Sequence, residues 1–138
     1  MTEDHLLERD ILIEARPEVV FAYFTDPGKI VLWLGRQATL EPHPGGQVRI
    51  EINDARTIIG EFVELVPPHR LVFTWGWAGS ISVPPGSTIV EVTLEPEGDS
   101  TRVRISHSGL PNNQEHTDHA RAWEPALSRL KTITAPQG

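Results

Sequence analysis

Turn-forming residues recur at short intervals between residues 37 and 108, and this punctuation constrains the fold more than any other feature of the chain. Clusters of proline, glycine, asparagine and aspartate divide the segment into short runs in which apolar and polar side chains alternate. Such short connections join antiparallel strands, because parallel strands need a crossover of about a dozen residues or more. We therefore predict an antiparallel meander with strands near residues 37–41, 46–53, 57–66, 69–76, 87–95 and 100–108.

The segment before this meander predicts one further strand and two short helices. An apolar run among charged residues indicates a strand at residues 7–15. Pro17 can open a helix without losing a needed donor, which predicts a helix at residues 17–25. Asp26 can cap the next helix, which is predicted at residues 27–34.

A long C-terminal helix is predicted at residues 113–133. Asn112 and Glu115 resemble a capping box at its start. The apolar side chains that recur at helical spacing are Trp123, Leu127 and Leu130. Pro125 removes one backbone donor from the interior of this helix, so we expect a kink or break near residues 121–124.

Together these elements predict the α+β class and a single domain spanning residues 1–138. In this arrangement a curved antiparallel sheet of six or seven strands wraps around the long C-terminal helix, and two short helices follow the first strand. The last helix alone is long enough to cover one face of the sheet. Such a helix-grip fold leaves a cavity at its open end, where ligands commonly bind. The longer loop at residues 77–86 is a candidate lid.

Composition removes several classes of function. The 138 residues include 12 basic and 19 acidic side chains and no cysteine, and the net charge is −7. This charge argues against nucleic acids and anionic membranes as partners. The absence of cysteine excludes disulfides, thiolate nucleophiles and cysteine-ligated metals. No apolar run is long enough for a membrane span, and the acidic residues 1–10 do not resemble a signal peptide, so we expect a cytoplasmic protein.

Motifs along most of the chain resemble a known family in their order and spacing. They are Thr25-Asp26-Pro27 with Trp33 and Gly35, Pro44-Gly45-Gly46, Gly60 with Glu64, the run from Pro67 to Trp75, Thr101 with His107-Ser108-Gly109, and Trp123 with Leu127 and Leu130. The chain resembles the C-terminal domain of Aha-type activators of the heat-shock-protein-ninety ATPase. That family lies within the SRPBCC, START-like or birch-pollen-allergen-like superfamily. The resemblance implies a helix-grip fold with a hydrophobic cavity, and catalysis in some branches.

The leading functional hypothesis is a binding protein that holds a small apolar or aromatic molecule between the sheet and the last helix. No cofactor and no metal are expected, and the protein is expected to be a monomer or homodimer. The residues expected to bind the ligand are Phe73, Trp75, Trp77, His107, Trp123 and Leu127. One alternative, implied by the resemblance, is an interaction protein of the stress response that acts on a chaperone. The other is an enzyme similar to polyketide cyclases or dehydratases.

The candidate residues leave several alternatives open. Alternation places His107 on the apolar face of its strand, either as an acid or base or as a structural side chain. Trp77, at the start of the long loop, lies either at a pocket mouth or on ordinary surface. His116 and His119 have a spacing that can share a metal, but a solvated helix face is favoured. The arginines that either meet an acidic ligand or are simply solvated are Arg36, Arg49 and Arg56.

Overall fold

The structure, a computed structural model, describes residues 6–135. The expected absence of a signal peptide rests partly on residues 1–5, and the expected domain includes residues 136–138; both stretches lie outside the described residues. The elements are β1 (Leu7–Ile13), α1 (Pro17–Thr25), α2 (Pro27–Ile30), β2 (Gln37–Leu40), β3 (Gln47–Glu51), β4 (Thr57–Val66), β5 (Arg70–Trp75), β6 (Thr88–Glu97), β7 (Ser100–Ser108) and α3 (Asn113–Thr134).

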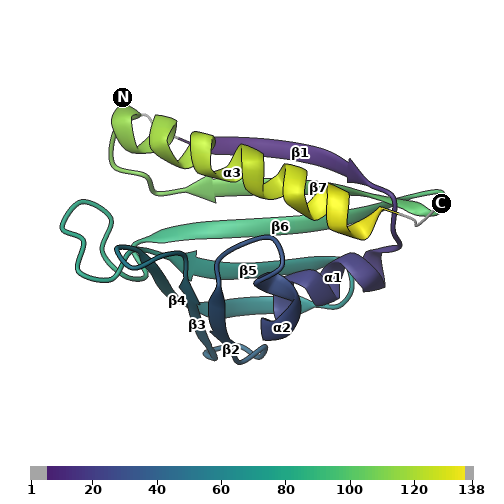
Figure 1. The fold of residues 1–138 in the computed structure, drawn as a ribbon, viewed down its shortest axis with the longest axis horizontal. Coiled ribbons are helices and arrows are strands. Elements are labelled where there is room, and N and C mark those ends of the chain that lie inside the picture. The colour runs from purple at the N-terminus through teal and green to yellow at the C-terminus, as the bar shows by residue number, and fades with distance from the viewer. Residues whose placement is uncertain (1–5, 136–138) are drawn as a thin grey trace.

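The seven strands form one sheet in the order β1-β7-β6-β5-β4-β3-β2. Every neighbouring pair is antiparallel, and the meander runs unbroken from β2 to β7, with β1 added beside β7. Figure 1 shows α3 lying lengthwise along the sheet over β1 and β7. The α+β helix-grip architecture is thereby confirmed. Among residues 6–135, no helix combines the length and apolar character that crossing a membrane requires.

The predicted helices differ from the observed ones in two places. Helix α1 has the predicted bounds, whereas α2 ends at Ile30 and a turn replaces its expected last residues. The break expected near Pro125 is wrong, because α3 runs as one helix from Asn113 to Thr134. Pro125 itself is exposed, while Trp123 before it and Leu127 after it are both buried in the same core. Packing on both sides of the proline therefore holds the helix together.

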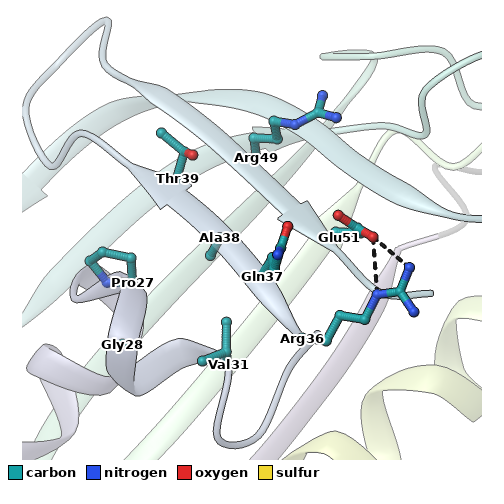
Figure 2. A pocket seen from close by; sticks show the side chains of 9 residues that line it. All are labelled: Pro27, Gly28, Val31, Arg36, Gln37, Ala38, Thr39, Arg49 and Glu51. Carbon is teal, nitrogen blue, oxygen red and sulfur yellow. Dashed lines mark hydrogen bonds and ion pairs between the residues drawn. The ribbon is translucent and has the colours of Figure 1, made fainter. Parts of the chain in front are cut away.

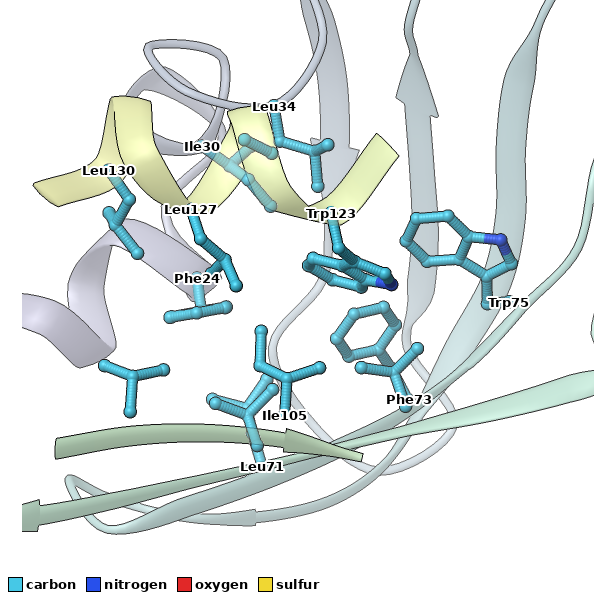
Figure 3. Close-up of a cluster of buried hydrophobic side chains, with 14 of the residues drawn as sticks. Phe24, Ile30, Leu34, Leu71, Phe73, Trp75, Ile105, Trp123, Leu127 and Leu130 are labelled. Carbon is cyan, nitrogen blue, oxygen red and sulfur yellow. The ribbon is translucent and has the colours of Figure 1, made fainter. Parts of the chain in front are cut away.

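The core lies between α3 and the inner face of the sheet. Along β7, Val103, Ile105 and His107 are fully or almost fully buried, as the alternation predicts. Figure 3 shows side chains from α1, α2, α3 and strands β5 and β7 meeting in this cluster. Trp33 and Trp123 are both buried in this core. The apolar stripe on α3 is thus covered by the sheet rather than by solvent.

The loop at residues 77–86, a candidate lid from the sequence, is fastened to the rest of the fold. The amide of Trp77 donates to the carbonyl of Val83 at 2.8 Å, and the amide of Ala78 donates to that of Thr57 at 2.9 Å. Val83 is fully buried. The hydroxyl of Ser82 also donates to the carboxylate of Glu115 on α3 at 3.0 Å. These contacts hold the loop in place against the helix and β4.

Gly60 in β4 lets the backbone of the neighbouring strand β5 come closer than it could to a residue that carries a Cβ atom. A Cβ at this position would lie 1.9 Å from the carbonyl oxygen of Thr74 in the neighbouring strand. Gly60→Ala should therefore lower the free energy of unfolding by about 1–3 kcal/mol, because the strands must move apart to admit the methyl group. Urea unfolding at pH 7 measures this, with the half-exposed Val63→Ala in the same strand as the control. Equal stability of the two variants would contradict the tight approach.

Candidate functional site

The best candidate site is an aromatic pocket where the middle of α3 faces the end of the sheet. Its volume is about 240 Å³. The ten residues that line it are Leu34, Gly35, Ile52, Arg56, Trp75, Trp77, Ala122, Trp123, Pro125 and Arg129. Two of them are arginines and the others carry no charge. The pocket occupies the open end of the helix grip, where the fold predicts a ligand cavity.

Three tryptophans form one wall of this pocket. The ring centroid of Trp75 lies 5.5 Å from that of Trp77, edge to face, and 5.3 Å from that of Trp123. Figure 3 shows Trp75 and Trp123 side by side at the edge of the buried cluster. Trp75 is buried and Trp77 is half-buried. The wall is thus an extension of the core that becomes accessible at its outer edge.

Behind the wall, a chain of three hydrogen bonds joins α3 to the sheet. The indole Nε1–H of Trp123 donates to Nδ1 of His107 at 3.1 Å. Because Nδ1 is an acceptor, the neutral ring carries its proton on Nε2, which lies 2.9 Å from the hydroxyl oxygen of Thr88. That hydroxyl donates to the carbonyl of Trp75 at 2.7 Å. This network assigns the Nε2–H tautomer and uses both ring nitrogens.

His107 is neutral in this environment. Burial, together with the nearby His119, lowers its pKa from 6.5 to about 3. Its side chain is fully buried, with both nitrogens engaged, so a substrate in the pocket has no free nitrogen to meet. An acid or base at neutral pH needs a pKa near the working pH and access to the reacting group. The geometry therefore fits the structural reading of His107.

His119 is buried, and the expectation of a solvated face is wrong for it. It is 2% exposed, and its Nε2 accepts from the indole of Trp77 at 3.1 Å. Its Nδ1 then donates to the carbonyl of Glu115 at 2.8 Å. Burial lowers the pKa of His119, although the hydrogen bond to this carbonyl and the carboxylate of Glu115 oppose the shift. His119 precedes Trp123 by one helical turn, and this is why it faces the core.

Metal binding has no support in the part of the chain that the structure covers. Nε2 of His116 lies 3.1 Å from the carbonyl oxygen of Leu6, whereas the ring nitrogens of His119 bond Trp77 and Glu115. No group of three histidine, aspartate or glutamate side chains in residues 6–135 is arranged to hold a metal ion.

Two arginines line the pocket, and neither has an acidic partner among the residues that the structure describes. The guanidinium carbon of Arg56 lies 4.8 Å from the ring centroid of Trp77, in cation–π geometry. Arg129 donates from Nε to the carbonyl of Trp33 at 3.1 Å. No carboxylate within residues 6–135 forms an ion pair with either side chain. The pocket therefore combines an apolar wall with uncompensated positive charge.

Trp75 carries the one buried side-chain polar atom that lacks a partner among the described residues. Its indole nitrogen Nε1 is inaccessible to solvent and has no acceptor. A buried donor without an acceptor costs about 1–3 kcal/mol, so most proteins avoid one. Its position in a residue that lines the pocket fits the tendency of such exceptions to occur near functional sites.

The structure separates the expected ligand-binding residues into two groups. Trp75, Trp77 and Trp123 line the pocket. Phe73, His107 and Leu127 lie in the core behind it and do not line it. The pocket residues that sequence reasoning missed are Leu34, Gly35, Ile52, Ala122, Pro125 and Arg129.

Two other hollows are open and polar. Figure 2 shows the first, about 360 Å³ between α2 and the β2–β3 edge, where the ion pair of Arg36 with Glu51 lies and where Arg49 is exposed. Arg36 also pairs with Asp54. The second, about 450 Å³, lies on the outer face of the sheet near Arg104. Neither has an aromatic wall, so neither matches an apolar ligand.

Comparison with known proteins gives a consistent family match. The family model described as "Activator of Hsp90 ATPase homolog 1-like protein" matches residues 14–135. The solution structure of an AHSA1-like protein from Rhizobium etli is 40% identical, covers 99% of this chain and 88% of that chain, and has a TM-score of 0.77. None of the curated proteins is significantly similar in sequence.

Two further solved structures share the fold at lower identity. The Aha1 dimer from Colwellia psychrerythraea is 21% identical, with 94% of this chain and 95% of that chain covered and a TM-score of 0.79. An HSP90 activator from Plasmodium falciparum is 22% identical, with 93% and 94% covered and a TM-score of 0.77. At these identities the likeness is evidence of fold.

Proposed function

Because the chain belongs to the family of activator of Hsp90 ATPase homolog 1-like proteins, we propose that it uses the cavity of this fold to bind a small apolar or aromatic molecule. The observation that carries the proposal is the pocket wall of Trp75, Trp77 and Trp123 at the open end of the helix grip. Aromatic side chains offer large apolar faces on which a ring can pack. The volume of about 240 Å³ suits a ligand of one or two rings.

The enzyme alternative has weaker support. Its acid or base is His107, which is fully buried and already bonded through both nitrogens. The pKa of about 3 keeps this ring from carrying a proton at neutral pH. A binding role does not require His107 to react, so it fits this geometry better.

Family membership supports a second candidate, an interaction protein that stimulates a chaperone ATPase. The family's description and the name of one structural neighbour refer to Hsp90 activation. Added to an Hsp90-type chaperone, the protein would raise its rate of ATP hydrolysis. An Ala122→Phe variant with a blocked pocket should stimulate as well as the wild type if the surface alone acts.

A pocket-filling substitution tests the binding proposal. Ala122 is exposed on α3 and lines the pocket, so the ring of Ala122→Phe should occupy the space a ligand needs. We expect binding of 2-naphthamide, a neutral two-ring probe, to fall at least about tenfold while the free energy of unfolding changes by less than about 1 kcal/mol. Isothermal titration calorimetry measures the affinity, and urea unfolding measures the stability.

Ser128→Phe is the matched control, since it adds the same ring to an exposed position of α3 that does not line the pocket. This variant should bind 2-naphthamide as the wild type does. If the two phenylalanine variants bind equally well, the probe lies elsewhere on the protein and the pocket proposal is wrong.

A further inference from the structure

The pocket brings two positive charges together in a chain whose overall charge is negative. The net charge is −7, and most arginines lie beside a carboxylate. The arginines with an acidic partner within 4 Å are Arg9, Arg16, Arg36, Arg70, Arg102 and Arg104. Arg56 and Arg129 have no such partner among residues 6–135, and neither have Arg49 and Arg121, which do not line the pocket. The pocket thus holds two cations for which the described chain supplies no anion.

Both side chains are held in ways that leave donors available. Arg56 lies over the ring of Trp77, and its guanidinium donates no hydrogen bond to another residue within 6–135. Arg129 uses Nε for the carbonyl of Trp33, which leaves its terminal nitrogens without a partner among residues 6–135. A guanidinium presents its remaining donors in a planar fork that matches a carboxylate. These contacts fix the two arginines before any ligand arrives.

We propose that the ligand of this pocket is a small aromatic acid. Its ring packs against Trp75 and Trp77, and its carboxylate accepts hydrogen bonds from the guanidinium groups of Arg56 and Arg129. This inference rests on the proposed function, because it names the class of molecule that the same pocket takes. The apolar wall accounts for the ring, and the unpaired arginines account for the acid.

The size and charge of the pocket both favour this class over a lipid. About 240 Å³ holds one or two rings but not a long acyl chain. Arg56, which lies over the ring of Trp77, also carries a positive charge that the carboxylate of a ligand would balance. A neutral ring of the same shape would leave both guanidinium groups unpaired beside it.

A matched pair of probes tests the inference. 2-Naphthoate and 2-naphthamide have nearly the same shape and differ in charge. Calorimetry at pH 7 should show that the wild type binds the acid at least about tenfold more tightly, as expected for hydrogen bonds to a charged group. Arg56→Gln should remove most of this preference without weakening the amide, and Arg56→Lys should retain part of it. Arg49→Gln removes the same charge at an exposed site outside the pocket, so it should leave both affinities unchanged.

The outcomes separate this inference from the binding proposal beneath it. If acid and amide bind the wild type equally, and Ala122→Phe weakens both, the aromatic pocket stands and the acid preference is wrong. If the preference is present but survives in Arg56→Gln and Arg129→Gln alike, another cation provides it and the assignment to these arginines is overturned. If neither probe binds, or both bind Ala122→Phe unchanged, the proposed function itself fails.

Discussion

Lowering the pH from 7 to 4 should cost this protein about 3 kcal/mol of unfolding free energy through His107 alone, which is a large share of a typical stability of about 5–15 kcal/mol. The pKa of this histidine is about 3 in the folded protein and 6.5 as the unperturbed value. Above pH 7 the ring is neutral in both the folded and the unfolded state, so its titration does not change the free energy of unfolding. Between pH 6.5 and 3 the unfolded chain binds a proton that the folded protein excludes, so stability falls as the pH falls.

Other groups contribute in known directions. Burial also lowers the pKa of His119, so this ring adds to the loss of stability over the acid range. The groups around it are Glu115 and Asp118, which raise its pKa, and Arg56, which lowers it. Arg36 lowers the pKa of Asp54, so the stability that this carboxylate contributes is lost only at the lowest pH values.

Urea unfolding at several pH values, followed by far-ultraviolet circular dichroism, measures the effect. The wild type should lose about 1.4 kcal/mol per pH unit through His107 between pH 6 and 4. His107→Gln cannot titrate, so its stability should fall less steeply by that amount even if it starts lower at pH 7. His43→Gln, at an exposed position, should keep the wild-type slope. Parallel slopes for His107→Gln and the wild type would show that His107 does not cause the dependence.

Trp123→Ala should be the most damaging single truncation on α3, with a loss of about 3–5 kcal/mol from the missing ring. The side chain is 2% exposed and packs against Trp75. The same substitution removes the donor to Nδ1 of His107, which then lies buried without a partner. That unsatisfied acceptor adds about 1–3 kcal/mol to the loss. The sum approaches the whole stability of a domain of this size.

Trp123→Phe separates the two contributions, because it keeps most of the ring but has no N–H. It should cost less than the alanine variant and still more than Ile81→Ala, a truncation at a position that is 97% exposed. Urea unfolding at pH 7 compares the three. A phenylalanine variant as stable as the wild type would mean that the hydrogen bond to His107 contributes nothing.

Local patterns predicted the fold well because each of them is set by neighbours in sequence. The bounds of α1 follow from Pro17 and Asp26, and those of β4 follow from turn residues on both sides. The expected break at Pro125 was wrong, because that expectation considered the missing backbone N–H of the proline and not the packing of its neighbours. The side chains on both sides of the proline are buried against the folded sheet, and this packing outweighs the loss of one backbone hydrogen bond.

The site was harder to predict, since its parts come from distant segments. Arg56 precedes β4, whereas Arg129 lies near the end of α3, and no spacing rule relates them. His119 was within reach of sequence reasoning: the stripe through Trp123 and Leu127 extends back one turn to it. The charge pattern suggested solvent, because Glu115 and Asp118 flank His116 and His119. The helical period was the better guide at this position.

Three of the four tryptophan indole N–H groups donate to an acceptor, and the one in Trp75 does not. Trp33, Trp77 and Trp123 donate to the carbonyl of Tyr23, to His119 and to His107 respectively. An indole N–H that is protected from hydrogen exchange usually also shows the downfield proton shift of a hydrogen bond. The N–H of Trp75 should be protected by burial but should lack that downfield shift, because it has no acceptor among the described residues. Its resonance in a nitrogen-15 spectrum should therefore stand apart from those of Trp33 and Trp123. It gives the pocket wall a spectroscopic reporter that needs no label beyond the isotope.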